Sequence, residues 1–137
     1  MTGPLAGRRL GQVALVLAGL GLAIVGVNGL TAPRALLAPL GIPLDAPSAL
    51  SEGRANYGGM HVGMGLFFLS SAFVPRLRTA ALLAATTFMG GLFLGRVVSV
   101  AVDGVPDPFV GVLFATELGG AALAAAALAL ETRRRRA

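Results

Sequence analysis

Hydrophobic residues fill four long segments of the chain, and polar residues gather in the stretches between them. The segments are 10–30, 55–74, 79–102 and 109–130. A helix needs about 20 mostly apolar residues to cross the hydrocarbon core of a membrane. Each segment is apolar around its whole circumference, which favours burial in lipid and against neighbouring helices. The pattern therefore predicts an all-α, membrane-embedded four-helix bundle, with residues 1–137 as a single domain.

Helix-ending residues lie where these segments stop and start. Pro33 and Pro75 follow the first and second segments. Because proline cannot continue a helix, they are expected to end these two helices. Gly104 stands where a C-terminal cap of the third segment belongs. Asp107 and Pro108 are typical of the start of the fourth helix. The first segment is longer than the core of a signal peptide, about 7–15 residues, so it is interpreted as a membrane span.

Composition agrees with a lipid environment. Apolar residues make up 55% of the chain and charged residues 12%, whereas soluble domains carry about 25% charged residues. The chain has no cysteine and one histidine, which argues against disulfides and against thiolate or histidine metal sites. No cofactor and no metal are therefore expected.

Arginine placement predicts the orientation. Eight arginines lie before the first segment, between the second and third, and after the fourth: Arg8, Arg9, Arg76, Arg78, Arg133, Arg134, Arg135 and Arg136. The opposite connections carry Asp45, Asp103 and Asp107 with Arg34. The positive-inside rule then places both termini in the cytoplasm and the protein in the cell inner (plasma) membrane. The arginine tail is interpreted as a contact with anionic lipid headgroups, not nucleic acid, because no aromatic or groove-reading element accompanies it.

The connection at 32–50 is rich in proline and also apolar. Four of the eight prolines lie in it. Such a loop is unsuited to free exposure in water. It is interpreted either as a lid or short interfacial helix over the outer face of the bundle, or as a stiff packed connector.

Glycine pairs four residues apart predict close helix packing. They are Gly59 with Gly63 and Gly91 with Gly95, extended by Gly58, Gly65, Gly90, Gly119 and Gly120. Pairs of small residues at this spacing let helix backbones approach in lipid. Such faces also suit a homo-oligomer or a membrane partner protein.

Three ionisable residues fall at a common depth inside the predicted spans. With a rise of about 1.5 Å per residue, Arg96 and His61 lie roughly 9 Å and Glu117 roughly 12 Å from the outer helix ends. Asn28 enters from the same end. Charged groups in a membrane are costly and are usually paired or functional.

Helical spacing gathers further polar residues around these three. Two stripes share the spacing i, i+3, i+7: Arg96, Ser99 and Asp103, and Arg54, Tyr57 and His61. We expect Arg96 to pair with Glu117, because an unpaired charge at this depth costs several kcal/mol. His61 and Tyr57 are expected to face the pair, with Glu52 at the mouth. The candidate ligand-binding set is Arg96, Glu117, His61, Tyr57, Arg54, Glu52, Ser99, Asp103 and Asn28.

The ordered motifs resemble a known family. Glu52-x-Arg54-Ala55-x-Tyr57-Gly58-Gly59 with His61-x-Gly63, and then Gly95-Arg96-x-x-Ser99 with Asp103-Gly104, are similar to the signature of small bacterial four-helix membrane proteins known only as a domain of unknown function. The likeness covers nearly the whole chain, and it extends loosely to DoxX-like membrane proteins. It implies four helices and membrane residence, and it implies no activity, substrate or cofactor.

Three classes of function stay open. In the first, the polar cluster lines a cavity that binds a lipid headgroup, a small anion or a proton. In the second, Arg96 and Glu117 form a structural clasp in a non-catalytic accessory or scaffold protein. In the third, His61 and Glu117 act as general acid and base of a small enzyme on a lipid-like substrate. The chain has no nucleophile elbow, metal motif or nucleotide loop, so an enzyme is the least favoured class.

Overall fold

The computed structural model describes residues 3–136, with the side chains of 7–133, and these residues form helices and connections. The helices are α1 (Gly3–Thr31), α2 (Pro33–Leu37), η1 (Ala38–Leu40), α3 (Pro47–Gly53), η2 (Arg54–Gly59), α4 (Met60–Phe73), α5 (Pro75–Asp103) and α6 (Pro108–Arg136). The described part contains no strand, which confirms the all-α prediction. The side chains of Arg134, Arg135 and Arg136 lie outside the described residues, and so does the expected lipid contact of the tail.

Three helices of the described chain are long and apolar enough to cross a membrane. They are Gly7–Thr31, Pro75–Asp103 and Pro108–Arg133. Their length and composition make this a multi-pass membrane protein. The predicted second span, 55–74, differs from the other three. There the helical run changes from α to π geometry at η2, and α4 by itself has only 14 residues.

The chain divides into two compact units. One comprises Met1–Val16 and Ser71–Ala137, and the other comprises Leu17–Ser70. We call them the α5–α6 unit and the α1–α4 unit, and each is described by itself.

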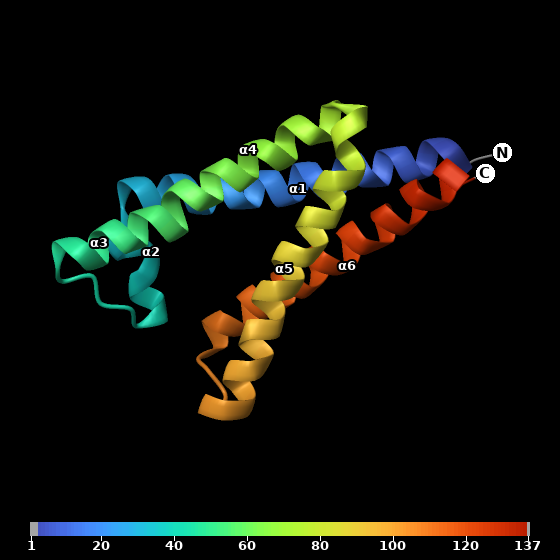
Figure 1. Ribbon diagram of the computed structural model, residues 1–137. Helices are drawn as coiled ribbons and strands as arrows, with labels where there is room; N and C mark the ends of the chain where they lie inside the picture. Colours follow the sequence, from blue (N-terminus) through green and yellow to red (C-terminus); the bar gives the residue numbers. More distant parts are fainter. Residues whose placement is uncertain (1–2, 137) are drawn as a thin grey trace. The chain divides into compact units, whose positions relative to one another are not determined.

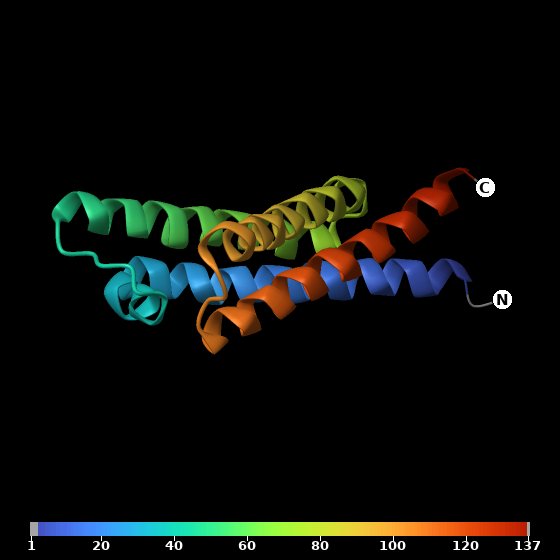
Figure 2. The same cartoon turned by 90° about the horizontal axis from the view of Figure 1, so that it is seen from below.

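In the α5–α6 unit, α5 and α6 run antiparallel and side by side (Figures 1 and 2). The connection between them turns at Gly104, which has φ 98° and ends α5 as predicted. Small residues lie in the core of this unit, where Ala85, Ala124 and Ala127 are fully buried. Nearer the connection, the rings of Phe93 and Phe114 meet edge to face with centroids 4.9 Å apart. Alanine lets the helix backbones approach, and the aromatic pair adds an edge-to-face contact between the helices.

In the α1–α4 unit, glycines bring α1 against η2 and α4, which lie side by side in Figures 1 and 2. A Cβ atom added at Gly26 would lie 2.6 Å from the amide nitrogen of Val62, and one at Gly65 would lie 2.9 Å from that of Ala23. At Gly29, a Cβ atom would overlap the carbonyl group of Tyr57. These positions admit no side chain, because backbone touches backbone.

The glycine pairs named from the sequence are not the ones that pack. Nothing in the structure lies within 4 Å of a Cβ built at Gly63, Gly91 or Gly95, and Gly59 has only a neighbour at 3.9 Å on its own helix. The prediction failed because spacing alone does not tell which face of a helix meets its neighbour. Gly58 and Gly65 carry the contact in their place, seven residues apart.

The proline-rich connection forms two short helices and a packed loop. Pro33 and Pro39 lie in the first turns of α2 and η1, where their missing N–H leaves no bond unmade. Leu37 and Leu44 are buried, and both lie close to Gly53 of α3. Arg34 donates from Nε to the carbonyl oxygen of Leu44 at 3.2 Å. Within its own unit this segment is thus anchored by Leu37, Leu44 and Arg34, while most of its other residues are exposed.

Arg78 departs from its predicted place in a loop. It lies in the first turns of α5 and is only 2% exposed, because α5 begins at Pro75 and leaves Val74 as the connection from α4. The residues after Pro75 were predicted as loop, since arginine commonly flanks a membrane span. Arg76 is exposed as expected.

Candidate functional site

A two-pronged ion pair joins α5 to α6. Arg96 donates from Nε to Oε2 of Glu117 at 2.6 Å and from Nη2 to Oε1 at 2.8 Å. The side chain of Glu117 is 10% exposed and that of Arg96 is 27% exposed. Parallel charged hydrogen bonds of this kind are stronger than neutral ones and fix the relative position of both groups. Both oxygens of the Glu117 carboxylate are therefore engaged by one guanidinium.

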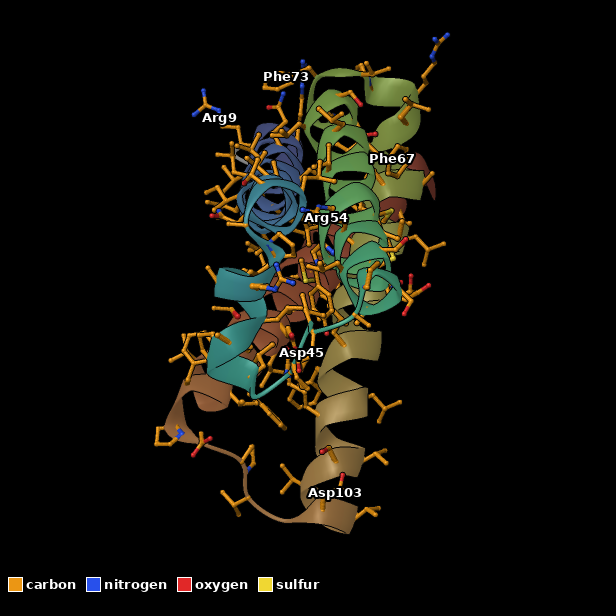
Figure 3. All side chains as sticks on the ribbon, turned by 90° about the vertical axis from the view of Figure 1, so that its left-hand side faces the viewer. Arg9, Asp45, Arg54, Phe67, Phe73 and Asp103 are labelled. Atoms are coloured by element: carbon orange, nitrogen blue, oxygen red, sulfur yellow. The ribbon has the colours of Figure 1, made fainter. Side chains whose placement is uncertain are left out.

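Ser99 and Asp103 continue along α5 from Arg96. Ser99 donates from Oγ to Oδ2 of Asp103 at 3.0 Å, and both residues are exposed. Asp103 lies at the last turn of α5, as Figure 3 shows. The hydroxyl is thus linked to a carboxylate one turn further along the helix.

A partly open groove lies beside the ion pair. Its volume is about 330 Å³, and it is lined by Gly91, Leu92, Gly95, Arg96, Ser99, Pro106 and Val110. Gly91 and Gly95 leave it open, since a Cβ atom at either would meet nothing within 4 Å. Leu92 and Val110 are its larger apolar lining residues, and Arg96 and Ser99 bring polar groups to it. The groove can therefore contact an apolar group and a hydrogen-bonding group at once.

A second polar cluster is built around the π-helix η2 in the α1–α4 unit. His61 lies with Nδ1 2.7 Å from the carbonyl oxygen of Asn56, five residues earlier. The rings of Tyr57 and His61 are stacked, with centroids 5.9 Å apart. A single π-turn within a helix is often found at functional sites, because its extra residue redirects side chains and backbone groups.

Three more predicted residues of this unit bond to backbone or to a neighbour. Arg54 donates from Nε to the carbonyl oxygen of Leu30, in the last turn of α1, at 3.2 Å. It thereby satisfies one of the carbonyls that a helix end leaves open. Figure 3 shows Arg54 between α1 and the helical run of η2 and α4. Glu52 accepts a bond from Asn56, and Asn28 donates to the carbonyl of Ile24 within α1.

The nine predicted residues thus fall into two groups. Arg96, Ser99, Asp103 and Glu117 belong to the α5–α6 unit, and Asn28, Glu52, Arg54, Tyr57 and His61 belong to the α1–α4 unit. Within the first group the structure joins Arg96 to Glu117 and Ser99 to Asp103. Within the second it joins Tyr57 to His61.

Asn56 and the π-turn were not predicted from the sequence. The expected stripe of Arg54, Tyr57 and His61 assumed regular α-helix, whereas residues 54–59 have the wider π geometry. The adjacent Gly58 and Gly59 were the available signal, because paired glycines weaken a regular helix.

Comparison with known proteins places the chain in a family. The family model described as domain of unknown function DUF4345 matches residues 10–128. The chain belongs to the DUF4345 family. The DUF4345 match contains every candidate residue of both groups, and it extends from α1 into α6. No curated protein and no solved structure matches the chain.

Proposed function

We propose that this DUF4345 protein is a single domain with four membrane spans, that both termini lie in the cytoplasm, and that it resides in the inner (plasma) membrane. The fourth crossing would be made by residues 47–73, in which α3, η2 and α4 follow one another without a gap. Together they are long enough to cross a membrane, although α4 alone is not. The arginine distribution and the loose likeness to DoxX-like four-helix proteins support the same arrangement.

The proposed function is the binding of a small polar or amphipathic ligand, or of a proton, in the outer half of the membrane. The observation that carries it is the ion pair of Arg96 and Glu117 beside the groove. A clasp between two helices needs only the two charges. Here Arg96 also lines a groove with the hydroxyl of Ser99, and two glycines keep that groove open. A lipid headgroup with the first part of its acyl chain has the mixture of polar and apolar surface that this lining favours.

Catalysis is not proposed, because both acid–base candidates already make bonds that position other groups. Glu117 accepts two bonds from Arg96, and His61 bonds the backbone at Asn56. A second candidate function is that of an accessory protein whose partner helix packs against α5. The open space beside Gly91 and Gly95 supports it, since small residues let a foreign helix approach.

The experiment compares thermal stability in mild detergent and copurifying molecules by native mass spectrometry. The variants are Glu117→Gln, the double variant Arg96→Met with Glu117→Leu, and Ser99→Ala. Breaking one side of a buried pair is costly, whereas replacing both charges by apolar residues is often neutral. For a binding site, we expect the double variant to be as stable as the wild type and to lose a bound molecule. Ser99→Ala should weaken that binding and leave the stability unchanged.

Two other outcomes would contradict a ligand-binding site. A double variant much less stable than the wild type, with the same copurifying molecules, would make the pair a structural clasp. A protein partner lost from the purified complex in a Gly95→Leu variant would favour the accessory function.

A further inference from the structure

Two further charges are buried in the α5–α6 unit, far along both helices from the Arg96 site. Arg78 lies in the first turns of α5 and is 2% exposed, and Glu131 lies near the end of α6 and is 7% exposed. In sequence, Arg78 is 18 residues before Arg96, and Glu131 is 14 residues after Glu117. On helices these separations return each residue to nearly the same face as its counterpart. Each helix therefore carries two charges of the same sign on nearly one face, and all of them except Arg96 are buried.

The bonds of these two side chains are incomplete. Arg78 donates from Nη2 to the carbonyl oxygen of Ala72 at 3.1 Å, which satisfies a carbonyl in the last turn of α4. Its Nε has no partner, and neither has Oε2 of Glu131. The hydroxyl groups of Ser71 and Thr79, next to Ala72 and Arg78 in the chain, are also buried without a partner. An unmet buried polar group costs about 1–3 kcal/mol, and more when it is charged.

The dipole of α5 opposes one of these charges as well. An arginine is disfavoured near a helix N-terminus, and Arg78 lies in the first turn of α5. Burial thus acts against both charged groups, and the helix dipole acts against Arg78. Something in this part of the protein has to compensate for them.

The side chain of Arg78 and the residue before Glu131 both meet one short stretch of α1. A Cβ atom added at Gly11 would lie 3.2 Å from Cδ of Arg78. One added at Gly7 would lie 3.4 Å from Cβ of Leu130, the residue before Glu131. Gly7 and Gly11 are one turn apart, so they share a face of α1. No direct salt bridge within 4.0 Å joins Arg78 to Glu131 in the described chain.

We propose that Arg78, Glu131, Ser71 and Thr79 form a second polar binding site, and that its ligand is water. The ligand must accept a hydrogen bond from Nε of Arg78 and donate one to Oε2 of Glu131. The opposite charges of the two residues cancel, so the site favours neither an anion nor a cation. Water supplies both kinds of bond in the smallest volume, and buried waters typically satisfy such groups. The ion pair that is direct at one end of the α5–α6 unit is bridged by water at the other.

Nuclear magnetic resonance of the ¹⁵N-labelled full chain in detergent micelles tests this directly. The Nε–H proton of Arg78 is assigned by the loss of its signal in Arg78→Lys. We expect a cross-peak between this proton and water. We also expect its resonance to shift in Glu131→Gln, which keeps the shape of the side chain and removes the charge. A proton with contacts only to alkyl groups, or one unaffected by Glu131→Gln, would overturn the proposal.

A stability cycle gives a second, independent measure. The variants are Arg78→Met, Glu131→Leu and the two combined. If water couples the charges, the double variant loses less in melting temperature than the sum of the single losses. Arg76→Met is the control, because this exposed arginine lies two residues away, and its loss should simply add to that of Glu131→Leu. Additive losses for Arg78 and Glu131 would overturn the proposal as well.

Discussion

The Nδ1 atom of His61 lies 2.7 Å from the carbonyl oxygen of Asn56, in the π-helical turn η2. A carbonyl oxygen can only accept, so Nδ1 carries the proton and donates it. In the neutral ring the lone pair then belongs to Nε2. The π-helical turn thus determines both the tautomer and the orientation of the only histidine. The ring of Tyr57 stacks on the His61 ring.

Removing the ring should loosen this turn. We expect His61→Ala to lower the free energy of unfolding by about 1 kcal/mol, because the Asn56 carbonyl loses its side-chain donor. His61→Phe keeps an aromatic ring beside Tyr57 and should recover part of the loss. Thermal unfolding followed by circular dichroism in mild detergent measures both. Met60→Ala, at an exposed neighbouring position, is the control. Equal stability of all three variants and the wild type would mean that this bond contributes nothing to the turn.

Two glycines of α1 should respond oppositely to the same change. Gly26→Ala places a Cβ atom 2.6 Å from the amide nitrogen of Val62, so the helices must separate. Overpacking of this kind costs about 1–3 kcal/mol. Gly21→Ala meets nothing within 4 Å and should stabilise the helix by up to about 1 kcal/mol. Melting temperatures in one detergent compare the two. A Gly26→Ala protein as stable as Gly21→Ala would contradict the close contact between α1 and α4.

A side chain at Gly104 should strain the turn between α5 and α6. Its φ of 98° with ψ of −176° lies in a region that only glycine enters without strain. We expect Gly104→Ala to destabilise the protein by about 1–3 kcal/mol. Gly95→Ala serves as the matched control on the same helix, since its added Cβ atom meets open space. Urea unfolding monitored by the fluorescence of Tyr57 would detect the difference. Similar midpoints for the two variants would show that the turn can adopt another conformation.

The helices themselves could be predicted from the sequence because their signals are local. Long apolar runs and proline or glycine at their ends identify α1, α5 and α6 to within a few residues in most cases. The start of α5 was placed four residues late, since arginine near a membrane surface is typical of loops as well as first turns. The π-turn was not predicted, because the spacing of residues 54–61 was interpreted as regular α-helix. In the structure Gly29 and Gly58 bring α1 against η2, and Arg54 bonds across to Leu30. These contacts join residues far apart in the sequence, so local spacing does not indicate them.

The candidate site shows the same division between local and tertiary information. An unpaired charge inside a membrane is costly, so Arg96 and Glu117 could be predicted to form a pair from their positions in the sequence. The burial of Arg78 and Glu131 could not be predicted from the sequence. Both residues lie near segment ends, where a charge usually reaches water or lipid headgroups. Gly11 of α1, which is distant in sequence, lies against Arg78, and Gly7 lies against Leu130, the residue before Glu131.

The number of membrane crossings can be decided with single cysteines, because the chain contains none of its own. Cysteine is placed at Ser48, Arg76, Val105 or Arg133, all of which are exposed. With four spans and cytoplasmic termini, positions 48 and 105 face outward and positions 76 and 133 face the cytoplasm. A membrane-impermeant maleimide added to right-side-out vesicles should then label only the first two, and inverted vesicles should reverse the pattern. If the run from Pro47 to Phe73 does not cross, positions 48 and 76 label from the same side. That outcome would leave three spans and place the termini on opposite sides of the membrane.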